Sequence, residues 1–127
     1  HMTHSNTHIT LGKQGEVAAR NYLVQQGYEI LETNWSYNKG EIDIIALTPE
    51  YVVMVEVKTR STYDFGDPEE SIGTKKLRKL FDTADRYMEL KEIDREVRYD
   101  VITVVFHGNT WTIEHIPDAY YPFMSSL

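Results

Sequence analysis

The sequence of 127 residues contains no cysteine, so it can form neither a disulfide bond nor a thiolate metal site. It contains no apolar run long enough to cross a membrane and no pattern of a secretory signal peptide. We therefore expect a protein of the reducing cytoplasm that has no membrane partner.

Positive charge is also scarce. Thirteen Lys and Arg residues stand against twenty Asp and Glu residues, which gives a net charge of −7. A protein that only coats nucleic acid is expected to be basic. Any binding of phosphate groups must therefore depend on a local basic patch or on a metal ion.

The length and the composition predict one globular domain. A hydrophobic content of 41% and a charged content of 26% are ordinary for such a domain, and the chain is long enough to bury a core. We expect this domain to span residues 9–127. Residues 1–8 are polar and are expected to form a disordered tail, in which His1 and Met2 resemble a cloning remnant.

A predicted β-hairpin is the most informative stretch of the chain. Residues 40–45 and 55–60 are rich in β-branched residues and carry ionisable side chains at alternate positions. Residues 46–51 link them and contain a turn signal at Pro49. An even loop centred between Pro49 and Glu50 pairs residues whose numbers sum to 99.

This register predicts that four ionisable side chains share one face of the hairpin. Asp43 would face Glu56, and Glu41 would face Lys58, with the paired Cβ atoms roughly 5 Å apart. Because side chains alternate along a strand, the other face would be an apolar wall. The expected members of that wall are Ile42, Ile44, Ala46, Val53, Val55 and Val57.

Two opposed carboxylates repel each other by about 3–4 kcal/mol at an effective dielectric constant near 20. A shared proton, a nearby cation or a bound metal would relieve this repulsion. Lys58 supplies one positive charge against the three negative charges of Glu41, Asp43 and Glu56, so the deficit favours a divalent ion. Carboxylate oxygens suit Mg²⁺, Mn²⁺ or Ca²⁺, and the carbonyl group of Val57 is a further candidate ligand.

Such a metal would polarise a phosphate oxygen and lower the pKa of a bound water. Lys58 would orient or deprotonate that water, or stabilise developing negative charge. The alternative is an exposed cross-strand ion network without catalysis. The apolar neighbours Ile45 and Met54 argue against full exposure and favour the functional interpretation.

A helix is predicted over residues 10–26, with Thr10 as its N-cap and Gly27 as its stop. Gly12 and Gly15 weaken the helix and predict close backbone packing. Glu16 lies at the border of the apolar stripe, so it either looks toward the sheet or forms an i,i+4 pair with Arg20.

A second helix is predicted over residues 74–90, and it begins with a basic cluster of Lys75, Lys76, Arg78 and Lys79. Positive charge at a helix start opposes the helix dipole, so helix stability does not explain it. The cluster either holds a phosphate backbone or forms a solvated face paired with Asp82 and Asp85.

Further strands are predicted over residues 28–35, 98–106 and 111–116, so the order is helix, three strands, helix, two strands. This order describes an α/β or α+β fold with a mixed sheet. Asp100 either joins the site from a neighbouring strand or has an edge or capping role. The aromatic tail at residues 120–123 is expected to pack against the domain or to form a dimer contact.

Several of these motifs together resemble the YraN-type family. The two central hairpin motifs are the most specific, and the resemblance extends over most of the chain. The matching segments are Leu-Gly-x-x-Gly-Glu at 11–16, Gly-Tyr at 27–28, Gly-Glu-Ile-Asp-Ile-Ile-Ala at 40–46, Val-Glu-Val-Lys-Thr-Arg at 55–60 and Arg-Tyr-Asp-Val at 98–101.

The YraN-type family is similar to archaeal Holliday-junction resolvases and belongs to the PD-(D/E)XK nuclease superfamily. The resemblance implies a restriction-endonuclease-like α/β fold, with a mixed sheet of about five strands flanked by helices. It implies Asp43 and Glu56 as metal ligands, with Mg²⁺ or Mn²⁺ as the cofactor. It further implies Lys58 as the catalytic lysine and Glu16 as an additional catalytic carboxylate.

We therefore expect a metal-dependent endonuclease that hydrolyses phosphodiester bonds in nucleic acid, with DNA as the first candidate and branched DNA among the forms to consider. The candidate nucleic-acid contacts are Arg60, Lys75, Lys76 and Lys79. The alternative is a nucleic-acid-binding module of the same fold with weak or no catalysis. A homodimer is a further expectation, because cutting two strands needs two sites and one domain offers one.

Overall fold

The computed structural model describes residues 10–62 and 73–120. The predicted tail at 1–8 and the aromatic residues after Tyr120 lie outside the described residues. The predicted order of elements is confirmed. The elements are α1 (Leu11–Gln25), β1 (Glu29–Tyr37), β2 (Gly40–Leu47), β3 (Tyr51–Ser61), α2 (Thr74–Lys91), β4 (Glu96–His107) and β5 (Thr110–Ile116).

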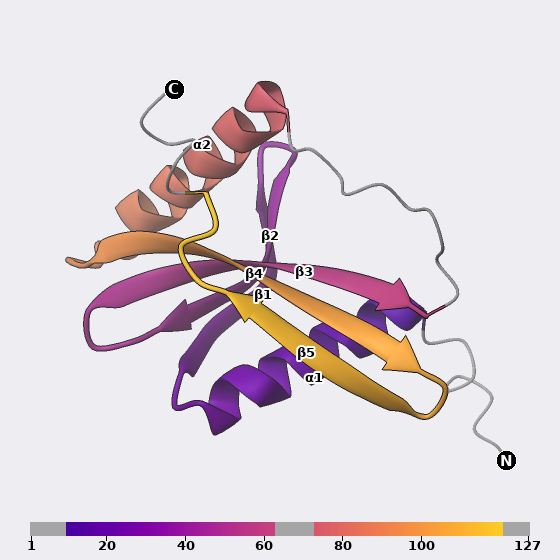
Figure 1. The fold of residues 1–127 in the computed structure, drawn as a ribbon. Helices are drawn as coiled ribbons and strands as arrows, with labels where there is room; N and C mark the ends of the chain where they lie inside the picture. The colour runs from indigo at the N-terminus through magenta and orange to yellow at the C-terminus, as the bar shows by residue number, and fades with distance from the viewer. Residues whose placement is uncertain (1–9, 63–72, 121–127) are drawn as a thin grey trace, which may run out of the picture.

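The strands form one five-stranded sheet in the order β1-β2-β3-β4-β5. Neighbouring strands are antiparallel except β3 and β4, which run parallel and are connected through α2. The two helices lie on opposite faces of the sheet (Figure 1). This is a mixed α/β arrangement consistent with a restriction-endonuclease-like fold. Neither helix is long and apolar enough to cross a membrane.

Each face of the sheet buries its own hydrophobic cluster. The cluster under α2 contains Ile42, Ile45, Met54, Leu77, Tyr87, Tyr99 and Tyr120, among others. The cluster under α1 contains Ala18, Ala19, Leu23, Ile44, Val53, Val55, Ile102 and Val104. Because β2 and β3 contribute to both clusters, they are covered on both sides.

The predicted hairpin register is confirmed near the turn, where β2 and β3 pair from Ile44–Val55 to Leu47–Val52. It is wrong beyond this point, because the ladder ends before it reaches Asp43. Instead, the Val57 N–H donates to Oδ2 of Asp43 at 2.8 Å. The expected direct pairing of Asp43 with Glu56, and of Glu41 with Lys58, is therefore not formed.

The predicted apolar wall also needs a correction. Ile42 packs in the α2 cluster together with Ile45, whereas Ile44 packs in the α1 cluster. Residues three apart cannot share a face of a regular strand, in which the side-chain period is two. Strand β2 therefore departs from regular alternation around Asp43, where its ladder with β3 ends.

Helix α1 approaches β3 closely because Gly15 has no side chain. A Cβ atom at Gly15 would lie 2.0 Å from Oγ1 of Thr59. The predicted close packing is therefore confirmed for Gly15 and is wrong for Gly12, where an added Cβ atom would lie 3.9 Å from Oγ1 of Thr10, an ordinary contact distance. The predicted N-cap is also confirmed, because Oγ1 of Thr10 accepts from the Lys13 N–H at 3.2 Å.

The two glycines of α1 should respond differently to alanine substitution. We expect Gly15→Ala to lower the free energy of unfolding by about 1–3 kcal/mol, because the added methyl group overlaps Thr59. Gly12→Ala should leave it unchanged or raise it by up to about 1 kcal/mol, because alanine favours the helix. Urea denaturation measures both values. Thr59→Ala should partly restore the stability that Gly15→Ala loses. Equal effects of Gly15→Ala and Gly12→Ala on the free energy of unfolding would contradict this packing.

Candidate active site

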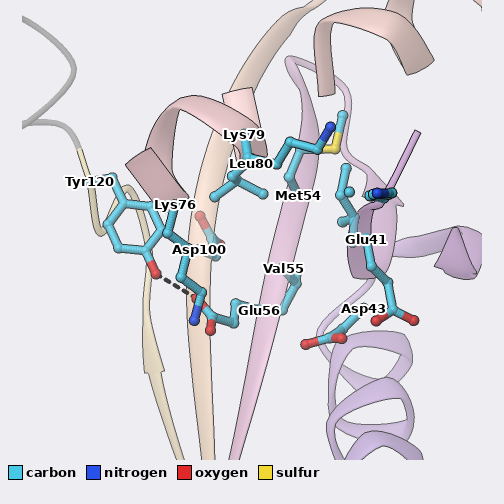
Figure 2. Close-up of a pocket in the computed structure, with 13 residues that line it drawn as sticks. Glu41, Asp43, Met54, Val55, Glu56, Lys76, Lys79, Leu80, Asp100 and Tyr120 are labelled. Atoms are coloured by element: carbon cyan, nitrogen blue, oxygen red, sulfur yellow. Dashed lines mark hydrogen bonds between the residues drawn. The ribbon is translucent and has the colours of Figure 1, made fainter. Parts of the chain in front are cut away.

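A cavity of about 310 Å³ lies between the N-terminal part of α2 and the strands β2 and β3. Lysines and carboxylates face it together, from several elements of the fold (Figure 2). Its ionisable lining residues are Lys39, Glu41, Asp43, Glu56, Lys76, Lys79, Asp100 and Tyr120. The fold thus brings acidic side chains of the central hairpin and basic side chains of α2 to one place.

Asp43 is a carboxylate of this cavity whose pKa is strongly raised. Burial raises its pKa to about 6, and the negative charges of Glu16, Glu56 and Glu41 add to this increase. The hydrogen bond from the Val57 N–H acts in the opposite direction without cancelling it. The three glutamates therefore lie close enough to Asp43 for their charges to add to the cost of burying its ionised carboxylate.

Glu56 is half-buried and accepts a hydrogen bond that the sequence did not predict. The hydroxyl group of Tyr120 donates to Oε1 of Glu56 at 2.6 Å. Burial, the hydrogen bond to Glu56 and the Glu56 charge all raise the pKa of Tyr120, so the phenol stays protonated and remains a donor. No fixed spacing in the sequence connects these two residues, because the contact spans 64 positions.

Glu16 is half-buried on α1 and lies near Asp43 of β2, in line with the first of its two alternatives. Its charge acts on Asp43, although Glu16 does not line the cavity on the α2 side. Its ion pair is with Lys13 at 3.5 Å rather than with Arg20.

The other predicted site residues fall into two groups. Lys76 and Lys79 line the cavity, and Lys79 Nζ also donates to the carbonyl group of Asn38 in the β1–β2 turn. Lys58 and Arg60 follow Glu56 at alternate positions of β3 and are half-buried, but they do not line the cavity. Lys75 is exposed and also lies outside the cavity lining.

Gly40 allows α2 to pack closely against β2 beside the cavity. A Cβ atom at Gly40 would lie 1.9 Å from Oγ1 of Thr83 and 3.3 Å from Cε of Lys79. Gly40, the first residue of β2, therefore permits the contact between this strand and α2. Without that contact, the lysines of α2 would lie farther from Asp43.

Within residues 10–62 and 73–120, no three acidic or histidine side chains converge closely enough to hold one metal ion together. Two carboxylates, those of Asp43 and Glu56, face the same cavity. This donor set fits Mg²⁺, which commonly binds one or two carboxylates and keeps its other positions for water and substrate phosphate oxygens. Burial raises the pKa of Asp43 most, and the neighbouring negative charges that raise it further also suit a cation.

Asp100 lines the cavity and is also held by a dense set of hydrogen bonds, so its place in the structure combines features of both alternatives. Its side chain is fully buried, and each of its oxygens accepts two hydrogen bonds. The donors are Arg98 Nε and Nη2, His115 Nε2 and the Asp118 N–H, at 2.8–3.0 Å. Burial alone would raise the pKa of Asp100, but these hydrogen bonds hold it below its ordinary value.

The five-stranded mixed sheet, with acidic and basic side chains gathered at the end of its central hairpin, defines an α/β protein of the restriction-endonuclease-like class. The chain belongs to the Uncharacterised protein family UPF0102, whose family model matches residues 15–104. The YraN-type resemblance is thereby confirmed. The matched range includes Glu16, Asp43, Glu56 and Lys58 and ends before Tyr120.

Bacterial relatives match nearly the whole chain. It is similar to the UPF0102 protein of Flavobacterium psychrophilum, with 43% identity over 116 residues, covering 91% of this chain and 98% of the relative. It is also similar to the UPF0102 protein of Bacteroides thetaiotaomicron, with 44% identity over 115 residues, covering 91% of this chain and 95% of the relative.

Asp43 should destabilise the metal-free fold at neutral pH. Its pKa in the folded protein is raised to about 6. The loss of folding stability that its charge causes is therefore absent below about pH 4, grows as the pH rises toward 6 and is complete above pH 6. Asp43→Asn keeps an acceptor for the Val57 N–H but removes the charge. We expect it to raise the free energy of unfolding by about 1–3 kcal/mol at pH 8 in EDTA, and by much less at pH 4.

Urea denaturation at both pH values measures this effect. The matched control is Glu50→Gln, which removes one negative charge from an exposed position in the β2–β3 turn. This control should show no comparable gain at pH 8. An Asp43→Asn variant that is less stable than the wild type at pH 8 would show that Asp43 is electrostatically satisfied without a cation.

Proposed function

We propose that the protein is a Mg²⁺- or Mn²⁺-dependent endonuclease that hydrolyses phosphodiester bonds in nucleic acid, with DNA, including branched DNA, as the first candidate substrate. The observation that carries this proposal is the shared cavity. Asp43 and Glu56, two of the three hairpin carboxylates in its lining, face it together with Lys76 and Lys79 of α2. Anionic side chains suit a metal ion, and cationic side chains suit the phosphates of a nucleic-acid strand.

Asp43, Glu56 and the carbonyl group of Val57 are the proposed metal ligands. A divalent ion bound there would neutralise phosphate charge and supply an activated water for hydrolysis. The protein contributes the placement of these ligands, because the Val57 N–H donates to Oδ2 of Asp43 at 2.8 Å, and no hydrogen bond to Oδ1 is formed among residues 10–62 and 73–120.

Two further residues are proposed to act on the reacting groups. Lys58 lies two residues beyond Glu56 on β3, so its side chain is on the same side of the strand. Its ammonium group is proposed to orient the attacking water or to stabilise negative charge on the phosphate. Glu16 is proposed as an additional carboxylate on the α1 side, since its charge already acts on Asp43.

The basic residues near the cavity are proposed to bind the strand on either side of the cleaved bond. Lys76 and Lys79 line the cavity itself. Lys75 at the start of α2 and Arg60 near the end of β3 would extend this contact beyond it. Such local binding is compatible with the net charge of −7, because a phosphate group senses the nearest charges most strongly when salt screens the others.

Substitution of a proposed ligand should abolish cleavage without unfolding the protein. We expect Asp43→Asn to reduce Mn²⁺-dependent cleavage of labelled duplex, flapped, four-way and single-stranded DNA by about 100-fold or more, in line with the loss of a group that acts on the transition state. Glu56→Gln should behave similarly. Because Asp43→Asn should be at least as stable as the wild type at pH 8, unfolding would not explain its lost activity.

Glu50→Gln is again the matched control and should cleave as the wild type does. Equal cleavage by the wild type and Asp43→Asn would refute the proposed catalytic site. Salt-sensitive DNA binding that needs no metal, with no cleavage of any substrate, would instead favour a nucleic-acid-binding module of the same fold.

Binding of nucleic acid should depend on salt through the lysines of α2. If about four phosphates are contacted, the logarithm of the affinity should fall with the logarithm of salt concentration at a slope of roughly −3 to −4. Lys76→Ala should weaken binding and make this slope shallower by about 1. Fluorescence anisotropy in Ca²⁺ or EDTA measures the slope.

Arg95→Ala removes the same charge from an exposed position between α2 and β4, at the opposite end of α2 from Lys76. It should leave the slope unchanged. If both substitutions change the slope equally, binding depends on overall charge and not on the cavity.

A further inference from the structure

Tyr120 contacts the proposed site without being one of its predicted residues. Its hydroxyl group donates to Oε1 of Glu56 at 2.6 Å, and the residue is 7% exposed. Its ring packs in the α2 cluster, which also contains Leu77, Tyr99 and Val101. The packing of the ring therefore fixes the position of the Tyr120 hydroxyl group, as it would not for a side chain on the surface.

The backbone that carries Tyr120 is fixed at two successive positions. The Asp118 N–H donates to Oδ1 of the buried Asp100 at 3.0 Å, and the Ala119 N–H donates to the Tyr99 carbonyl group at 2.7 Å. These contacts tie the segment after β5 to β4, the strand next to Glu56. The position of the Tyr120 hydroxyl group thus depends on the sheet itself.

Tyr120 approaches Glu56 from the side opposite to Asp43 (Figure 2). A glutamate side chain has three rotatable bonds, and a half-buried carboxylate without a partner samples several rotamers. A hydrogen bond from a packed phenol selects one of them. Because the phenol donates a single hydrogen atom to Oε1, Oε2 of Glu56 is left for another partner.

We propose that Tyr120 is a positioning residue, which holds Oε1 of Glu56 so that Oε2 is presented to a divalent cation shared with Asp43. The inference rests on the proposed function, because Glu56 matters here only as a cation ligand. Outer-shell hydrogen bonds of this kind orient metal ligands, and their loss weakens metal affinity by about 10–100-fold. Tyr120 lies outside residues 15–104, which match the family model.

The test is Tyr120→Phe, which keeps the ring and removes the hydroxyl group. We expect the dissociation constant for Mn²⁺, measured by calorimetric titration, to increase by about 10-fold or more. The Mn²⁺ concentration for half-maximal cleavage should rise by the same factor, while saturating Mn²⁺ should restore most of the rate. A purely structural role would lower the melting temperature without shifting the metal requirement.

Tyr87→Phe is the matched control. Tyr87 is 1% exposed, and its hydroxyl group donates to Oε2 of Glu32 at 3.2 Å. The control therefore removes a second buried phenol–carboxylate hydrogen bond from the same hydrophobic cluster. It should leave both the Mn²⁺ affinity and the metal requirement for cleavage unchanged.

A double-substitution cycle separates this inference from the proposed function. If Tyr120 acts through Glu56, Tyr120→Phe should have no further effect on Mn²⁺ affinity in a Glu56→Gln background. Wild-type Mn²⁺ affinity in Tyr120→Phe, together with weakened affinity in Glu56→Gln, would overturn the role of Tyr120 and leave the proposed site standing. Equal Mn²⁺ affinity and equal cleavage in the wild type and Glu56→Gln would overturn both.

A spectroscopic measurement covers the case in which Tyr120→Phe does not fold. With 3-fluorotyrosine placed only at position 120, the fluorine resonance should shift when Mg²⁺ is added to the otherwise wild-type protein. The same addition to the Glu56→Gln variant should produce no shift. Identical spectra with and without Mg²⁺ in the otherwise wild-type protein would overturn the inference.

Discussion

The hydrogen bond from the Val57 N–H to Asp43 is the interaction on which the proposed site depends. It occurs where the β2–β3 ladder ends. Just beyond the last paired residues, the backbone N–H of Val57 donates to a side-chain oxygen of Asp43. The bond fixes Asp43 between two strands that no longer pair regularly. The opening of the hairpin at this point allows carboxylates from β2 and β3 and lysines from α2 to face a common cavity.

Asp100, which is buried, and Asp43, which is half-buried, show how differently this fold treats negative charge. Asp100 receives four hydrogen bonds and packs as a satisfied structural anchor. Asp43 accepts a single hydrogen bond from Val57 and is surrounded by three other carboxylates, so its charge is poorly compensated. Proteins commonly concentrate such unfavourable electrostatics at functional sites. The same residue type therefore stabilises the fold in one place and supports the proposed chemistry in the other.

The features that could be predicted from the sequence are those controlled by local periodicity and by turn chemistry. The alternation of apolar residues and the turn at Pro49 were sufficient for the hairpin register from Ile44 to Val55. The same pattern could not predict that Asp43 would capture a backbone N–H, because strand periodicity assumes an unbroken ladder. Tyr120 was expected to pack as part of the aromatic tail, and it does, but its contact with Glu56 was missed because that contact depends on the tertiary fold.

The close approach of α1 at Gly15 determines from which direction the site can be reached. With this helix packed against Thr59, one face of the sheet is covered beside Asp43, and the cavity lies on the other face. A nucleic acid bound as proposed would meet Asp43 and Glu56 from that face, with Glu16 acting from the α1 side. Its two strands would then be inequivalent, one lying against the cavity and the other turned outward. One site would therefore reach one strand of a bound duplex at a time.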